Sequence, residues 1–212
     1  MRMKRMTQAL LYKGDHINRA NVVWNIAGSF VYAFASMVLS FLVIRLAGEE
    51  QGGIFSFGFS TLGQQLFLVA YFGIRPFHIT DGAGEYTFGD YREHRNITCL
   101  IALAAGAVFM MIRHGAYLRG VGDYNGEKCT ILLLLVVYKV IDGYADVYES
   151  EFQRQGSLYL TGKSNTFRTI LSVGVFLITL TVGKNLAVAC VAAVCGQAVG
   201  VDLFDVIVLC CL

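Results

Sequence analysis

The stretch VVWNIAGSFVYAFASMVLSFLVI, residues Val22–Ile44, contains no charged side chain and only a few polar ones. A helix needs about 20 mostly apolar residues to cross the roughly 30 Å hydrocarbon core of a membrane, and this stretch exceeds that length. It also exceeds the apolar core of a cleavable signal peptide, which is about 7–15 residues long. We therefore expect it to remain in the mature protein as a membrane-spanning helix.

Further apolar runs follow along the 212-residue chain. The predicted spans after the first are Ile54–Phe72, Ile97–Ile112, Cys129–Tyr148, Phe167–Val182 and Asn185–Val201. These runs are too long and too continuously apolar for the ~10-residue alternating strands of a membrane β-barrel. The chain is expected to be an all-α, polytopic membrane protein with about six transmembrane helices over residues 22–205. A basic tail (1–21) precedes them and an apolar stub (206–212) follows.

The overall composition agrees with this class. Hydrophobic residues make up 56% of the chain and charged residues only 15%, whereas a soluble domain carries roughly a quarter charged residues. No basic cluster is interleaved with aromatic residues, so nucleic acid is not an expected partner. The histidines and cysteines lack metal-ligand spacing and no catalytic set of side chains is recognisable, so we expect no metal, no other cofactor and no enzyme activity.

Lysine and arginine are unequally distributed between the two sides of the predicted bundle. The N-terminal tail and the loops after the second and fourth spans carry more of them than the opposite loops do. Because cytoplasmic loops are enriched in these residues, the distribution places both termini in the cytoplasm.

Polar residues form stripes on the faces of the first two predicted spans. In the first span, Asn25, Ser29, Tyr32 and Ser36 recur every three or four residues, which places them on one face of a helix. Gln64 belongs to a similar stripe in the second span. Polar groups are costly in hydrocarbon, so these faces are expected to meet protein or a water-filled cavity.

The span Cys129–Tyr148 carries charged residues at depths where hydrocarbon is expected. Lys139, Asp142, Asp146 and the following Glu149 share one helical face. A lone mid-membrane lysine costs at least about 2.5 kcal/mol on insertion scales. In one interpretation, the face lines a hydrophilic pathway in which Lys139 attracts an anionic headgroup and Asp142 takes part in ion or proton coupling. In the other, Lys139 and Asp142 form a static i, i+3 contact that locks helices together, and Asp146 and Glu149 form a solvated helix end.

Two predicted cytoplasmic loops are rich in arginine, tyrosine and glycine. The first runs from Arg75 to Arg95, and the second runs from Gln153 to Arg168 at the start of the fifth span. The simplest interpretation of tyrosine beside arginine is that both side chains anchor the protein at the membrane interface. Arg75 and Arg95 are also candidates for recruiting phosphate, and Arg168 is a further candidate site residue of these cytoplasmic loops.

Scattered residues from about Asn21 to Asp205 form a recognisable pattern. They are Asn25 with Gly28-Ser29, Arg45-Leu46-Ala47-Gly48, Gly53-Ile54-Phe55-Ser56, the loop residues Arg75, Asp81, Tyr86, Phe88, Asp90-Tyr91 and Arg95, and then Gln153-Arg154, Gly162-Lys163-Ser164 and Arg168. This pattern resembles the N-terminal half of a Wzx-type polysaccharide flippase, in the multidrug/oligosaccharidyl-lipid/polysaccharide exporter superfamily. The resemblance implies one lobe of a two-lobe exporter fold.

Flippases of this type move lipid-diphosphate-linked oligosaccharides across the bacterial inner membrane by alternating access. The resemblance therefore implies such a lipid-linked substrate and that location for this chain. Alternating access generally uses two repeats around a shared site, so a second lobe or a homodimer partner is implied. A split half, a dimerising subunit and a truncated product all remain open.

Two other functions are compatible with the sequence. One is a multidrug cation antiporter of the same superfamily, which would favour unpaired acids over the observed Lys139 beside Asp142. The other is a membrane scaffold or fragment that transports nothing.

Overall fold

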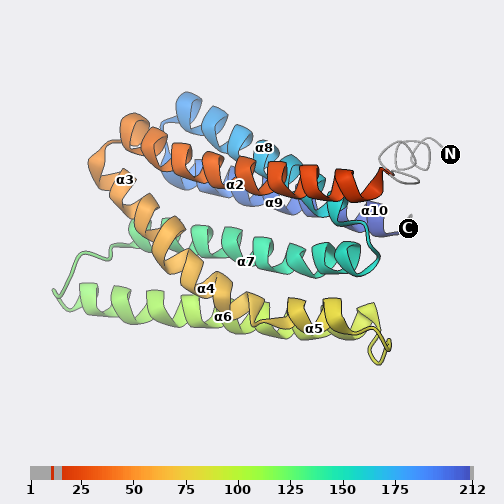
Figure 1. Cartoon of the computed structure of the whole chain (residues 1–212). Helices are drawn as coiled ribbons and strands as arrows, with labels where there is room; N and C mark the ends of the chain where they lie inside the picture. The colour runs from red at the N-terminus through yellow and green to blue at the C-terminus, as the bar shows by residue number, and fades with distance from the viewer. Residues whose placement is uncertain (1–10, 12–15, 211–212) are drawn as a thin grey trace.

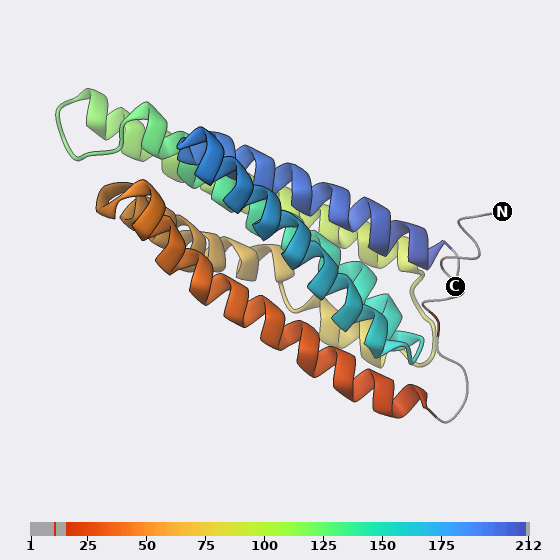
Figure 2. The ribbon, with the colours of Figure 1, turned by 90° about the horizontal axis from the view of Figure 1, so that it is seen from above.

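The computed structural model describes residue 11 and residues 16–210, so most of the basic tail and the last two residues lie outside the described part. All regular structure in that part is helical. The helices lie side by side in an elongated bundle (Figure 1). The start of α2, the α5–α6 and α7–α8 connections and the C-terminal end of α10 lie at one end of this bundle (Figures 1 and 2). This arrangement agrees with the predicted alternation of loops.

The described chain passes along the bundle six times. The first pass is α2 (Ile17–Ala47). The second consists of α3 (Glu49–Ser56), the π-helix η1 (Phe57–Leu62), α4 (Gly63–Tyr71) and the short α5 (Ile74–Thr80). The third, fourth and fifth are α6 (Phe88–Leu118), α7 (Gly126–Arg154) and α8 (Leu158–Gly183), and the sixth is α9 (Leu186–Gly200), which continues through the π-helix η2 (Val201–Val206) into α10 (Ile207–Leu209).

Five of these passes are long and apolar enough to cross a membrane, which confirms the predicted all-α, multi-span class. They are Ile17–Ala47, Glu49–Thr80, Phe88–Leu118, Leu158–Gly183 and Leu186–Leu209. The remaining pass, α7, has 29 residues. Because a helix rises about 1.5 Å per residue, α7 is also long enough to cross a membrane. It is more polar than the others, and it lies between α6 on one side and α8 and α9 on the other (Figure 1). Every residue of α7 from Ala145 to Phe152 is buried.

Several helices extend beyond the apolar runs that predict them. The third span begins at Phe88 rather than Ile97 because Thr87 and Asp90 form a capping box, in which each side chain accepts the other's backbone N–H. The last pass continues beyond Val201 to Leu209. A helix is longer than its hydrocarbon segment when its flanking polar residues pack inside the protein, and hydropathy alone does not report that packing.

The second pass is broken between α4 and α5. Phe72 and Gly73 both have left-handed backbone angles, with φ of 42° and 67°, and such angles end an α-helix. Arg95 Nη1 donates to the carbonyl oxygens of Ala70 and Tyr71 at 2.9 and 2.7 Å. Thr98 Oγ1 also donates to Ala70, at 2.8 Å. These bonds satisfy carbonyls that the break frees, which is how irregular backbone is tolerated at membrane depth.

Candidate functional site

The acidic face of α7 meets arginines from three other helices. Asp146 accepts from Arg75 Nη1 of α5 at 2.6 Å and from Arg95 Nη2 of α6 at 2.7 Å. Arg75 also lies 3.5 Å from Glu149 and donates to Gln153 at 3.0 Å. A buried charge without a partner destabilises a fold by several kcal/mol, so these contacts account for the presence of carboxylates inside the bundle.

Arg168 of α8 forms the second centre of this network. Its Nη2 donates to Glu149 and lies 3.8 Å from Asp142, while its Nε lies 3.6 Å from Asp205 of η2. The hydroxyl of Ser164 donates to Asp205. The Arg168 side chain is only 2% exposed, and its Nη1 makes no hydrogen bond within the described residues. The guanidinium therefore retains an unused donor.

Lys139 is linked to Asp142 through a third residue. Its Nζ donates to Tyr32 Oη at 2.8 Å, and this hydroxyl donates to Asp142 Oδ2 at 3.1 Å. The ammonium also lies 4.1 Å from the centre of the Phe59 ring, within the range of a cation–π contact. Asp142 accepts a further bond from Gln197 at 3.2 Å. The bridging tyrosine thus replaces the predicted direct i, i+3 contact.

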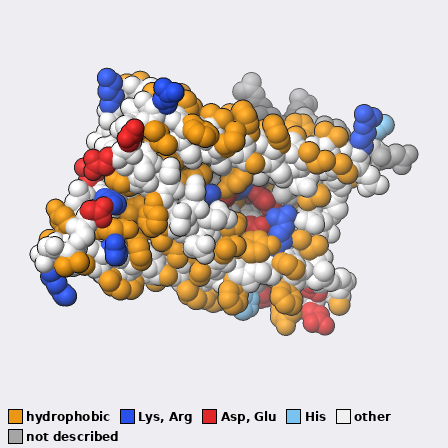
Figure 3. Space-filling model, turned by 60° about the vertical axis from the view of Figure 1, so that its left-hand side comes forward, with side chains coloured by type: hydrophobic (Ala, Val, Ile, Leu, Met, Phe, Trp, Pro, Cys, Tyr) orange, Lys and Arg blue, Asp and Glu red, His pale blue; other side chains and the backbone are white. Residues whose placement is uncertain are grey.

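A polar cavity of about 270 Å³ lies among α2, α4, α5, α7 and α8. It is lined by Tyr32, Gln64, Phe67, Tyr71, Arg75, Asp142, Asp146, Glu149, Asn165 and Arg168. Figure 3 shows a hollow on one face of the molecule, with charged side chains inside it and hydrophobic side chains around it. Six of the sequence-derived candidates therefore share one cavity: Tyr32, Gln64, Arg75, Asp142, Asp146 and Arg168.

The other candidates lie elsewhere. Within the described part, Asn25 and Ser36 are half-buried, Ser29 is exposed, and none of the three lines this cavity. Lys139 reaches the cavity lining through Tyr32. Arg95 is fully buried against Asp146.

Two sequence-based placements are wrong. Arg75, Arg95 and Arg168 lie within α5, α6 and α8, not in loops. Asp146 and Glu149 are buried in ion pairs and do not form a solvated helix end. Both errors have one cause, because the helices continue past the apolar runs and bring the two sets of charges together.

Asp205 and Ser164 are site residues that the sequence reasoning missed. Asp205 is fully buried, although it lies beyond the predicted end of the last span. The run from Val201 to Leu209 is apolar except for Asp202 and Asp205, and these acids were the available signal.

The basic and acidic side chains of the network balance one another. Lys139, Arg75, Arg95 and Arg168 face Asp142, Asp146, Glu149 and Asp205. An anionic ligand must therefore compete with an internal carboxylate for an arginine, and a cation must compete with an arginine for a carboxylate. No group of three or more His, Cys, Asp or Glu suited to a metal ion occurs between residues 16 and 210 or at residue 11.

The chain is a multi-span helical membrane protein with a charged cavity inside the bundle. Comparison with known proteins finds no matching family model, no matching curated protein and no matching solved structure. The resemblance to Wzx-type flippases therefore rests on the residue pattern in the sequence.

Proposed function

We propose that this chain is one lobe of a flippase that moves lipid-diphosphate-linked polysaccharide precursors across the bacterial inner membrane by alternating access. It works with a second lobe or a second copy of itself, and both termini face the cytoplasm. The observation that supports this function best is the cavity of about 270 Å³ inside the bundle, which carries Arg75 and Arg168 beside three carboxylates.

The chemistry of such a substrate fits this cavity. A lipid diphosphate joins an anionic, sugar-bearing head to a long hydrocarbon tail, so its head needs a polar path while its tail stays in an apolar medium. Arginine binds phosphate oxygens through parallel N–H donors. The side chain of Arg75 is 21% exposed and is the more accessible arginine, whereas Arg168 is buried and has an unused donor. Lys139, held behind Tyr32, supplies further positive charge.

The balanced charges suggest how binding and rearrangement are coupled. A diphosphate reaches Arg75 by replacing Asp146 or Glu149, which are its present partners at 2.6 and 3.5 Å. Displacement of these acids loosens the contact between α5 and α7. A ligand that binds one arrangement better than another shifts the population toward it, as alternating access requires.

The two other candidate functions are less well supported. A multidrug cation antiporter needs accessible carboxylates, but Asp146 and Glu149 each contact two arginines. A non-transporting scaffold would use the same ion pairs only to hold helices together. The scaffold makes a distinct prediction, since it would bind no lipid diphosphate.

A binding experiment tests the function directly. The purified chain in nanodiscs is titrated with undecaprenyl diphosphate, next to Arg75→Gln and the matched control Lys128→Gln. Lys128 pairs with an exposed aspartate, Asp123, at the opposite end of α7. We expect binding by the unmodified chain and by Lys128→Gln, and affinity lowered at least about tenfold in Arg75→Gln.

A complementation experiment tests transport. The chain is expressed in a bacterial strain without its polysaccharide flippase, alone and together with the C-terminal lobe of that flippase, and surface polymer is scored. Restored polymer in either arrangement supports the proposal. A chain that is inserted and stable, yet neither binds the lipid diphosphate nor restores polymer, would refute it.

A further inference from the structure

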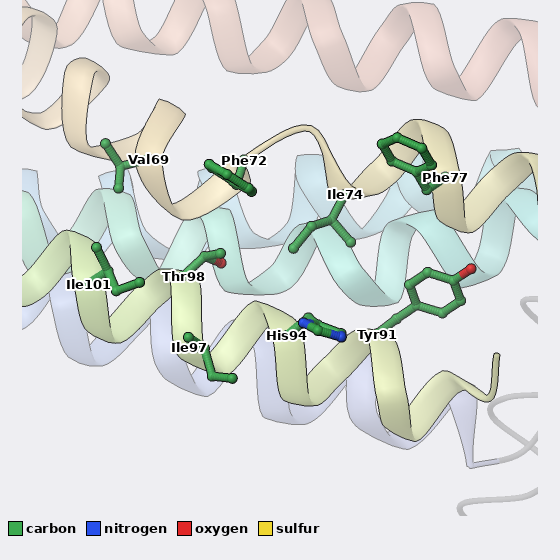
Figure 4. Close-up of a pocket in the computed structure, with 9 residues that line it drawn as sticks. All are labelled: Val69, Phe72, Ile74, Phe77, Tyr91, His94, Ile97, Thr98 and Ile101. Atoms are coloured by element: carbon green, nitrogen blue, oxygen red, sulfur yellow. The ribbon is translucent and has the colours of Figure 1, made fainter.

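A second, larger cavity lies on the opposite side of the α4–α5 break. This groove measures about 480 Å³. Figure 4 shows Val69, Phe72 and Ile74 on one side of it, with Ile97 and Ile101 of α6 on the other. Phe72 is 74% exposed and Ile101 is 54% exposed. Both helical segments belong to candidate membrane spans, so the groove opens toward hydrocarbon.

The groove offers few polar groups to a ligand. Its polar side chains are Tyr91, His94 and Thr98. The Tyr91 hydroxyl already donates to Asp81 at 3.0 Å, and the Thr98 hydroxyl donates to the carbonyls of Ala70 and Arg95 at 2.8 and 3.0 Å. Arg95, from inside the bundle, donates hydrogen bonds to the carbonyl oxygens of Ala70 and Tyr71. The helix break therefore makes a depression in the protein surface without leaving these carbonyls unpaired. Such a surface suits a hydrocarbon chain.

The break places this groove directly beside the polar cavity. Tyr71 and Arg75 line the cavity, whereas their neighbours Phe72 and Ile74 line the groove. A ligand with an anionic head and an apolar tail meets matching surfaces on the two sides of this short segment. The continuity distinguishes the groove from the rest of the lipid-facing surface.

We propose that the groove holds the hydrocarbon tail of the lipid-diphosphate substrate while its diphosphate lies at Arg75. The assignment rests on the proposed function, and it adds a tail-binding site between α4–α5 and α6. Ile74 and Arg75 are consecutive residues, so headgroup and tail act on the same short helix. This helix is also held to α7 by His78 Nε2, which lies 2.8 Å from Glu151.

The experiment must therefore measure where the lipid tail lies on the protein, not how tightly the lipid binds. A tail that leaves the bilayer for a protein groove gains little hydrophobic free energy, because lipid tails are as apolar as the groove. Packing in the groove fixes where the tail lies. We therefore choose undecaprenyl diphosphate with a photoactivatable group in its tail, bound to the chain in nanodiscs, and map the labelled residues by mass spectrometry.

The expected result is labelling of residues 69–77 and 91–101. Ile101→Trp fills the groove and abolishes this labelling. Ile112→Trp, on the same helix and also exposed, leaves it unchanged. The labelling map of the unmodified chain tests the groove assignment even if Ile101→Trp fails to fold.

Three results would overturn the assignment, and they differ in what they leave standing. Binding with labels elsewhere on the chain refutes the groove and leaves the proposed function intact. Groove labelling by photoactivatable phosphatidylglycerol that persists at saturating lipid diphosphate assigns the groove to bulk lipid. Absence of any lipid-diphosphate binding removes the proposed function and the groove assignment with it.

Discussion

Gly28 of α2 and Gly162 of α8 face each other with no side chain between them. A Cβ atom on Gly28 would lie 2.5 Å from the carbonyl oxygen of Gly162, and a Cβ on Gly162 would overlap the carbonyl oxygen of Trp24. Backbones approach this closely only where both residues lack a side chain, and small residues are the usual means of packing helices in membranes. The contact fixes α2 against α8 and so sets one wall of the polar cavity.

We expect Gly162→Ala to destabilise the bundle by about 1–3 kcal/mol, the usual range for overpacking. The matched control is Gly174→Ala in the same helix, where an added Cβ meets no atom within 4 Å. Thermal unfolding in detergent compares the two. Equal midpoints for both variants would contradict the close α2–α8 contact.

Arg168→Gln is expected to cost about 3–5 kcal/mol, because it leaves buried acids without their counter-charge. The affected acids are Glu149, Asp142 and Asp205. Adding Asp205→Asn to this variant recovers part of the loss. Lys128→Gln serves as the control and lowers the unfolding midpoint far less, since its partner Asp123 is 75% exposed. Equal destabilisation by Arg168→Gln and Lys128→Gln would show that the buried network does not form.

Tyr32→Phe and Lys139→Met should be coupled in a double-mutant cycle. The Tyr32 hydroxyl bridges Lys139 and Asp142, so its removal matters most while the lysine is present. We expect a coupling energy of about 0.5–3 kcal/mol from denaturation of the two single variants and the double variant. A parallel cycle with Tyr117→Phe, near the C-terminal end of α6, should be additive within about 0.5 kcal/mol. Additivity in both cycles would rule out the bridge.

Acid is expected to release the α5–α6 connection. The backbone N–H groups of Glu85 and Tyr86 donate to the Asp81 carboxylate at 3.0 and 3.2 Å, and Tyr91 Oη donates at 3.0 Å. These bonds hold the pKa of Asp81 below its ordinary 3.8, and the bond from Glu85 makes the largest contribution. Because the folded-state pKa is the lower one, the stabilising contribution is present above about pH 3.8 and disappears as the pH falls through the folded-state value.

Limited proteolysis with an acid-active protease measures this change. Cleavage within residues 81–87 should rise in the unmodified chain only at the lowest pH. Asp81→Asn should be cleaved there readily at pH values where the unmodified connection resists. A connection that is equally resistant in both proteins would contradict the role of the carboxylate.

Hydropathy and helical periodicity were enough to predict the bundle and part of the lining of its cavity. The span Val22–Ile44 falls within α2, and Tyr32 on its polar stripe meets Asp142 on the stripe of α7. Both follow from general constraints, because hydrocarbon thickness sets the length of a span and a helix repeats its faces every three to four residues.

The pairing of charges could not be predicted in the same way. Arg95 and Asp146 are far apart in sequence, yet they are 2.7 Å apart in space. Arg95 precedes the apolar run of its helix, so hydropathy places it in a loop, whereas the capping box at Thr87 extends the helix and carries Arg95 inside. The second predicted span ends at Phe72, where the helix does break, but the short helix α5 that follows the break and carries Arg75 was not predicted.

The polarity of α7 has a consequence for how the protein is made. On biological insertion scales, each lysine or aspartate at the centre of a helix opposes entry into the bilayer by about 2.5–3.5 kcal/mol, and α7 contains Lys139, Asp142 and Asp146. Its counter-charges lie both upstream, in α5 and α6, and downstream, in α8. Asp146 can pair with Arg75 and Arg95 before α8 is made, whereas Arg168, the partner of Glu149, is synthesised only with α8. Neutralisation of the charges on α7 is therefore complete only after α8 has been made.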